Sequence, residues 1–139
     1  MGESVLSEAA GVRCEEVALS VIASEVGTPC FVYSASAIRA QYALLHDALR
    51  DVDARLHYSV KANSSIAVLA LLRELGAGVD IVSGGELHRA LLAGYNGRDI
   101  VFSGVGKTER EIEEALNAHV LLFNAESEQE LNVIQGVAR

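Results

Sequence analysis

The stretch Tyr58-Ser59-Val60-Lys61-Ala62-Asn63 places a lysine where a strand-like run stops and a helical run begins. The residues before it, 54–60, are typical of a strand that enters a hydrophobic core. A lysine is seldom buried unless it is paired or used chemically. A lysine shielded from water can lose its proton near neutral pH and attack carbonyl carbons. Lys61 is therefore a candidate for Schiff-base chemistry with an aldehyde cofactor such as pyridoxal phosphate, and a plain surface lysine is the competing interpretation.

Outward from Lys61, strand-like and helix-like runs alternate four times with short connections. We expect strands at 55–60, 78–82, 99–102 and 120–123, and helices at 65–75, 86–93, 109–118 and 128–138. This pattern predicts parallel strands with right-handed crossovers. The strand ends fall 20 to 22 residues apart. So regular a step favours a TIM-type (β/α)8 barrel over an open doubly wound sheet.

The expected domain organisation follows from this count of units. A complete barrel needs eight βα units and typically ~250 residues, and only about four are present here. The fold class is therefore α/β, the N-terminal part of a barrel. We expect a poorly ordered N-terminus at 1–15 and a helix-strand-helix lead-in at 16–53, with helices at 16–26 and 36–50 and a strand at 28–33. Residues 54–139 are expected to form the first half of the barrel.

Strand side chains alternate between two faces, and this predicts where polar groups gather. Ser59 and Lys61 share one face of their strand, opposite Tyr58 and Val60. By the same rule Asp80 faces the barrel interior.

At the next two strand ends, Ser103 and Asn124 face inward as well. These groups collect at the carboxyl ends of the strands, where β/α barrels build their active sites. For Asp80, a structural ion pair inside the barrel is an equally good interpretation. Glu86 follows Ser83 by three residues, which is a capping-box pattern and explains Glu86 without any catalytic role.

Two features exclude other classes of function. The loop Gly104–Thr108 (GVGKT) resembles the end of a phosphate-binding P-loop, but that motif requires a glycine at position 101, where this chain has Val101. We expect a strand-to-helix turn instead, with Thr108 as the helix N-cap. The net charge of −8, from 11 basic and 19 acidic residues, argues against a nucleic-acid-binding surface.

The cysteines and the apolar runs bear on location and metal binding. Cys14 and Cys30 have no metal-site spacing, and no apolar stretch is long enough to span a bilayer. With no secretory signal visible, we expect a cytoplasmic protein with reduced thiols, no bound metal and no membrane contact.

Four segments carry a resemblance to a known family. They are Gly27–Tyr33 (GTPCFVY), Tyr58–Asn63 (YSVKAN), Gly76–Leu87 (GAGVDIVSGGEL) and Phe102–Thr108 (FSGVGKT), with a weaker fifth at Phe123–Ser127 (FNAES). Together they resemble the diaminopimelate decarboxylases, fold-type III pyridoxal-phosphate enzymes with an alanine-racemase-like barrel. The lysine motif alone is shared with ornithine and arginine decarboxylases, whereas the third and fourth segments are similar to the diaminopimelate branch.

The resemblance implies a cofactor, a reaction and site residues. Lys61 would hold pyridoxal phosphate covalently, Ser59 and Asp80 would line the cofactor pocket, and Glu86 is a weaker pocket candidate. The implied reaction converts meso-2,6-diaminopimelate into L-lysine and carbon dioxide, the last step of lysine biosynthesis, in a homodimer.

The resemblance also implies what this stretch of chain does not supply. In the family, the histidine stacked on the cofactor ring, the phosphate loop, the acid at the ring nitrogen and the C-terminal β-domain come later in the sequence. We therefore expect the 139-residue chain to be inactive by itself. Three alternatives stay open: another fold-III decarboxylase of the ornithine, arginine or carboxynorspermidine type, a cofactor-binding regulatory protein, and a non-catalytic remnant.

Overall fold

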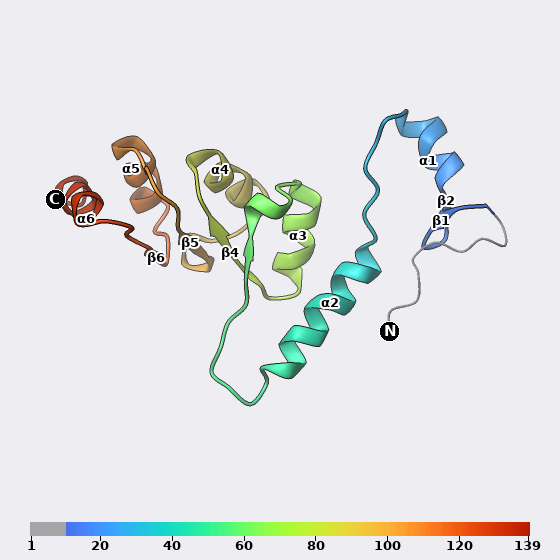
Figure 1. The fold of residues 1–139 in the computed structure, drawn as a ribbon, viewed down its shortest axis with the longest axis horizontal. Coiled ribbons are helices and arrows are strands. Elements are labelled where there is room, and N and C mark those ends of the chain that lie inside the picture. The colour runs from blue at the N-terminus through green and yellow to red at the C-terminus, as the bar shows by residue number, and fades with distance from the viewer. Residues whose placement is uncertain (1–10) are drawn as a thin grey trace. The chain divides into compact units, whose positions relative to one another are not determined.

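The structure, a computed structural model, describes residues 11–139. They divide into two compact units between Leu45 and His46, within the second helix (Figure 1). The helices are α1 Leu19–Val26, α2 Ala35–Ala48, α3 Ile66–Glu74, α4 Gly84–Leu92, α5 Glu109–Asn117 and α6 Glu128–Val137. The strands are β1 Arg13–Cys14, β2 Val17–Ala18, β3 His57–Ser59, β4 Gly78–Ile81, β5 Ile100–Phe102 and β6 Leu122–Phe123, with short 3-10 turns η1 Val60–Ala62 and η2 Gly97–Asp99.

The first unit begins with a small antiparallel ribbon of β1 and β2. The Glu15 carboxylate accepts hydrogen bonds at 2.7 Å from the Ser34 hydroxyl and from the Ser36 amide, close to the start of α2. Those hydrogen bonds lower the pKa of Glu15 below its ordinary value, the Ser36 amide contributing most. Residues 13 and 14 form a two-residue strand, which leaves no periodic signal in the sequence, and the expected poor order over 1–15 stays a prediction. Residues 1–10 lie outside the described residues.

The predicted strand over 28–33 is wrong. These residues form a loop that pairs with no strand among residues 11–139, and the Phe31 side chain is 90% exposed. Alternating apolar residues indicate a strand only where a partner strand can complete the ladder of backbone hydrogen bonds. The helices on either side do form, and α1 ends at Gly27, which has a φ of 89° that a glycine adopts at little cost. Nothing in the structure tests the predicted boundary between the lead-in and the barrel at residue 53.

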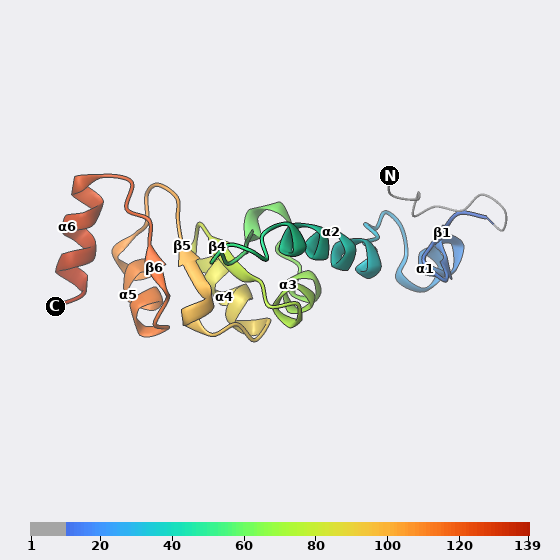
Figure 2. The ribbon, with the colours of Figure 1, turned by 90° about the horizontal axis from the view of Figure 1, so that it is seen from below.

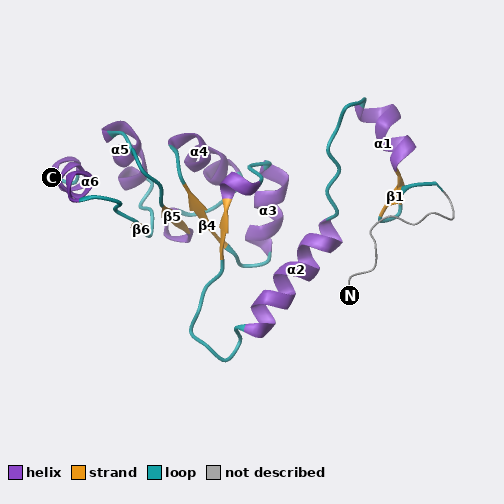
Figure 3. Cartoon of the chain, in the orientation of Figure 1, coloured by secondary structure: helices purple, strands orange, loops and turns teal. Residues whose placement is uncertain are grey.

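The second unit contains one four-stranded parallel sheet in the order β3-β4-β5-β6, with one helix after each strand (Figure 3). The regular succession of strand and helix is also visible in the second view (Figure 2). This arrangement confirms the four βα units and the parallel sheet that the alternating pattern predicts. Most elements are shorter than predicted by one or two residues at an end, although α4 begins two residues earlier than expected. The strand β3 ends at Ser59 because η1 already begins at Val60.

The core of this unit lies between the sheet and its helices. Val60, Val79 and Ile81, which alternate with the polar groups of β3 and β4, are fully buried. The buried cluster includes Val60, Leu69, Val79, Ile81, Leu87, Ile100 and Phe102. Tyr58 packs against this cluster as expected. The apolar face of β4 and β5 is therefore covered, and the opposite face carries the polar groups.

Candidate active site

Lys61 lies immediately after β3, in the turn η1. Its neighbour Val60 is fully buried and anchors the turn in the core, whereas Lys61 itself is exposed. Within residues 11–139 the Lys61 side chain is open to solvent, and shielding of its amine from water stays a prediction.

Ser59 is the last residue of β3, and its hydroxyl group is an unsatisfied hydrogen-bonding group. Its Oγ atom is buried and has no partner among the described residues. Ser59 lies next to Asp80 in the register of the parallel pair β3 and β4. Buried hydroxyl groups in native proteins nearly always have a partner, so an unpaired one is consistent with a ligand group that completes it.

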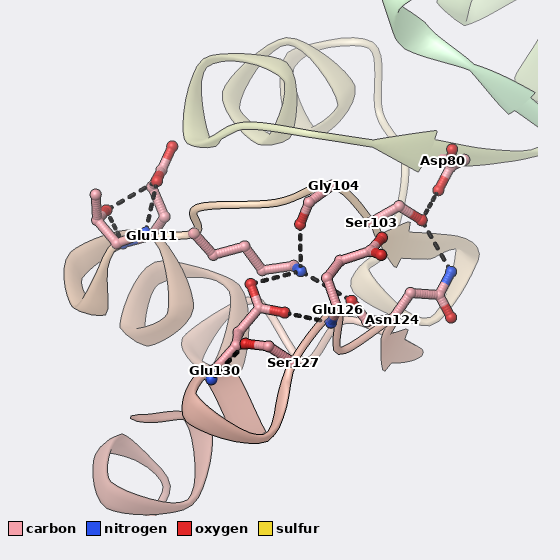
Figure 4. A network of polar contacts seen from close by, with 10 residues as sticks. Asp80, Ser103, Gly104, Glu111, Asn124, Glu126, Ser127 and Glu130 are labelled. Carbon is pink, nitrogen blue, oxygen red and sulfur yellow. Dashed lines mark hydrogen bonds and ion pairs between the residues drawn. The ribbon is translucent and has the colours of Figure 1, made fainter. Parts of the chain in front are cut away.

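A row of polar side chains continues across the next three strands (Figure 4). The Ser103 hydroxyl, after β5, donates a hydrogen bond to the Asp80 carboxylate. The Asn124 side-chain amide, after β6, donates to the Ser103 Oγ at 2.9 Å. The alternation rule predicted that these three side chains share the inner face, and their contacts confirm it. With Ser59, they form a four-residue set that we call the polar row: Ser59, Asp80, Ser103 and Asn124.

Glu86 serves the start of α4. Its amide donates to the Ser83 Oγ at 3.2 Å, as the capping interpretation predicted. Its carboxylate accepts from the amide of Val82 at 2.8 Å, where a standard capping box would use Ser83. Because the backbone engages this carboxylate, no contact in the structure supports a role for Glu86 in the cofactor pocket, and that role stays a prediction.

Sequence reasoning missed the buried lysine of this chain, which is Lys107. Its side chain is 1% exposed, and its ammonium lies 3.1 Å from the Glu130 carboxylate (Figure 4). It lies in the loop GVGKT, whose Thr108 is the N-cap of α5 as predicted. The pairing of Lys107 with a residue 23 positions later leaves no local sequence signal.

Two carboxylates beside this lysine and its loop have lowered pKa values. For Glu130, burial alone would raise the pKa, but the Glu126 amide and the Lys107 ammonium outweigh it. For Glu111, the amides of Gly84 and Thr108 and the Thr108 hydroxyl lower the pKa. Both groups are therefore held in the charged form by donors that the fold supplies.

Three further observations concern other kinds of site. Within residues 11–139, no three His, Cys, Asp or Glu side chains come together in a way that could hold a metal ion. Cys14 is half-buried, Cys30 is exposed, and both thiols are free. None of the described helices has the length and apolar character needed to cross a bilayer.

Comparison with known proteins decides the family. The family model described as "Pyridoxal-dependent decarboxylase, pyridoxal binding domain" matches residues 35–139. The chain belongs to this family. The match confirms the family resemblance and the cofactor, pyridoxal phosphate, that the residues around Lys61 predicted.

Individual members of the pyridoxal-dependent decarboxylase family are similar over most of this chain. A diaminopimelate decarboxylase from Pseudomonas fluorescens is 53% identical over 117 residues, which are 84% of this chain and 28% of that protein. One from Pseudomonas aeruginosa is 51% identical over 124 residues, 89% of this chain and 30% of its own length. The solved diaminopimelate decarboxylase from M. jannaschii, in complex with L-lysine, superposes with a TM-score of 0.86 at 32% identity, over 94% of this chain and 32% of that one.

The chain thus spans about 30% of the length of the relatives that it matches. Its fold is confirmed as an N-terminal part of the fold-type III decarboxylase barrel. Ser59 and Lys61 fit the cofactor in kind, since one offers an unpaired buried hydroxyl and the other an accessible amine at the same edge of the sheet.

Proposed function

We propose that this chain is the cofactor-anchoring part of a diaminopimelate decarboxylase, which converts meso-2,6-diaminopimelate into L-lysine and carbon dioxide. The observation that carries the proposal is the position of Lys61: it lies in the turn after β3, at the edge of the sheet where the polar row collects. The identity of about 50% to diaminopimelate decarboxylases supports this substrate over ornithine or arginine.

Each residue of the site would have a distinct task. Lys61 would bind the cofactor aldehyde through its Nζ. Bound pyridoxal phosphate supplies an electron sink for the bond that breaks on loss of carbon dioxide. The Ser59 hydroxyl would donate to, or accept from, a polar atom of the cofactor, because it has no other partner. Asp80, fixed by the Ser103 hydroxyl, would present a negative charge to the cationic part of the cofactor or substrate.

A hybrid protein tests the proposal most directly. In the hybrid, the aligned part of this chain replaces the matching 117 residues of the Pseudomonas fluorescens relative. The lysine released from meso-diaminopimelate is then measured. We expect the hybrid to be active and Lys61→Arg to abolish activity, because a guanidinium does not form the covalent link. Arg110→Lys, a change on an exposed side chain, is the matched control and should leave activity unchanged. A hybrid that decarboxylates ornithine in preference to diaminopimelate, or an active Lys61→Arg variant, would contradict the proposal.

The 139-residue chain by itself should release no carbon dioxide, and the same assay on the chain alone checks this. The cytoplasmic location and the homodimer that the sequence suggests stay predictions. A small amino acid as ligand is consistent with the M. jannaschii relative, which was solved with L-lysine.

A further inference from the structure

We propose that Lys107 is a positioning residue, whose buried ammonium holds Asn124 and, through it, Ser103 and Asp80 in place at the carboxyl edge of the sheet. The inference rests on the proposed function only in taking the polar row as part of the active site. The contacts of Lys107 do not depend on that function. Lys107 does not belong to the row and is not a catalytic residue; it acts through Asn124.

The Lys107 ammonium is fully hydrogen-bonded. Its Nζ donates to the carbonyl oxygen of Gly104 at 2.8 Å, to that of Asn124 at 2.9 Å and to Glu130 Oε1 at 3.1 Å. An ammonium has three donors, so all are used. Its side chain is 1% exposed, and that of Glu130 is 9% exposed. A charge so far from water persists only where it is fully paired, so this arrangement specifies a single position for the ammonium.

These contacts connect segments that lie apart in the sequence (Figure 4). Gly104 lies in the loop after β5, and Asn124 lies in the loop after β6. Glu130 belongs to the first turn of α6, and its second carboxylate oxygen accepts from the Glu126 amide at 2.7 Å. The ammonium also lies 5.7 Å from the centre of the Phe102 ring, within the range of a cation–π contact. Lys107 therefore joins two neighbouring strand ends and the following helix.

The connection reaches the polar row through one residue. The Asn124 carbonyl accepts from Lys107, and the side chain of the same Asn124 donates at 2.9 Å to the Ser103 Oγ. The Ser103 hydroxyl in turn donates to Asp80. A shift of the Asn124 backbone would carry its side-chain donor away from Ser103 and so loosen the hydrogen bond that orients Asp80.

Local and global effects can be separated by hydrogen exchange in the 139-residue chain. Lys107→Met keeps the length of the side chain and removes the charged donor to the Asn124 carbonyl. Loss of such a hydrogen bond is worth about tenfold or more in an equilibrium, so we expect the Asn124 side-chain amide, which donates to Ser103, to exchange with solvent about tenfold faster. The backbone amides of Leu69 and Leu87, both hydrogen-bonded in buried helical turns, serve as the internal reference. If Asn124 and the references accelerate by the same factor, Lys107 supports only global stability and the inference is overturned.

A second variant covers the case in which Lys107→Met does not fold. Glu130→Gln keeps an acceptor oxygen but removes the charge, and should produce the same selective acceleration at Asn124 to a smaller extent; no selective change in a folded Glu130→Gln chain also overturns the inference. Arg110→Met is the matched control, because Arg110 pairs with Glu114 at 2.8 Å on the surface, where its side chain is 86% exposed. It should leave the exchange of Asn124 unchanged.

The two proposals fail separately. An inactive hybrid that contains Lys107 would count against the proposed function and leave the exchange result standing. Unchanged exchange at Asn124 in Lys107→Met would overturn the positioning role, whatever the activity of the hybrid.

Discussion

The two lysines of this chain, Lys61 and Lys107, occupy opposite environments. Lys61 is exposed at the end of β3, while Lys107 is buried and fully paired. An accessible amine suits the binding of an aldehyde, and a buried, paired ammonium suits the support of neighbouring groups. The chemistry of a lysine here follows from its partners more than from its place at the end of a strand.

The central hydroxyl of the polar row should contribute to stability. Ser103→Ala removes the donor to Asp80 and the acceptor for Asn124, and we expect the free energy of unfolding to fall by about 1–2 kcal/mol. Urea denaturation measures this change. Ser64→Ala is the control, because Ser64 is also half-buried in the second unit but makes no side-chain hydrogen bond among those described. Equal effects of the two substitutions would show that the row is not formed.

The Glu111 carboxylate makes stability depend on pH with a defined sign. Its pKa in the folded state lies below the ordinary value of 4.5, chiefly because the Gly84 amide donates to it. The stabilisation is therefore complete above about pH 4.5 and is lost as the pH falls through the folded-state pKa. Glu111→Gln should lower the unfolding free energy at pH 7 and make its decline between about pH 5 and pH 3 shallower.

The matched control for this pH dependence is Glu113→Gln, a change of an exposed glutamate in the same helix. It should keep the steep decline of the original chain. The pH profile of thermal unfolding distinguishes the two variants, and an unchanged slope for Glu111→Gln would contradict the assignment.

The site could be predicted from the sequence wherever strand alternation decides it. The inward direction of Asp80, Ser103 and Asn124 follows from counting residues along each strand. The exposure of Lys61 and the burial of Lys107 cannot be predicted in this way, because both depend on the other segments that cover or pair with these side chains. A pair such as Lys107 and Glu130 forms only after two βα units are in place.

At the scale of elements, the N-caps offer a direct comparison between two helices. Thr108 forms a complete capping box with Glu111 at the start of α5, whereas Ser65 at the start of α3 makes no side-chain cap hydrogen bond. Thr108→Ala should therefore cost about 1 kcal/mol of unfolding free energy, and Ser65→Ala much less. Thermal unfolding of both variants checks this difference. A loss for Ser65→Ala as large as that for Thr108→Ala would contradict the capping assignment.

Two glycines should respond in opposite ways to alanine. A Cβ atom on Gly97 would lie 1.8 Å from the Ala118 carbonyl oxygen, so the η2 turn cannot accept it without moving the chain after α5. A Cβ on Gly136, in the exposed last turn of α6, would meet nothing within 4 Å. Gly97→Ala should destabilise by more than about 2 kcal/mol. Gly136→Ala should be neutral or stabilise by up to about 1 kcal/mol. Chemical denaturation measures both, and a stable Gly97→Ala chain would contradict the close packing.

The helices and the four sheet strands were predictable because caps, glycine stops and periodicity agree along the second unit. The structure of residues 28–33 was not predictable in this way. Their apolar pattern predicts a strand, but they have no partner strand in the described chain. Local pattern shows what a segment can form, and only pairing decides whether it forms.

For the second unit as a whole, the sheet leaves both outer strands open among the described residues. Leu121 and Leu122 at the β6 edge are 47% and 43% exposed. Open edges with apolar side chains favour pairing between chains. We expect the 139-residue chain to self-associate as its concentration rises, and Leu122→Lys to reduce this association. Sedimentation velocity at several concentrations tests it, with Leu91→Lys, a change of an exposed leucine on α4, as the control. If Leu122→Lys and Leu91→Lys reduce self-association equally, the contact between chains does not lie at the β6 edge.

The acidic residues at the helix starts affect the order in which the second unit unfolds. Glu111 of α5 accepts from the Gly84 amide at the start of α4, and Glu130 of α6 accepts from Lys107, which precedes α5. The third and fourth βα units are thus each linked to the unit before them. A chain built in this way behaves as a row of coupled repeats, in which the loss of one unit weakens its neighbour. Unfolding should accordingly spread from α6 backwards, so that the β6 end of the sheet frays long before β4 does.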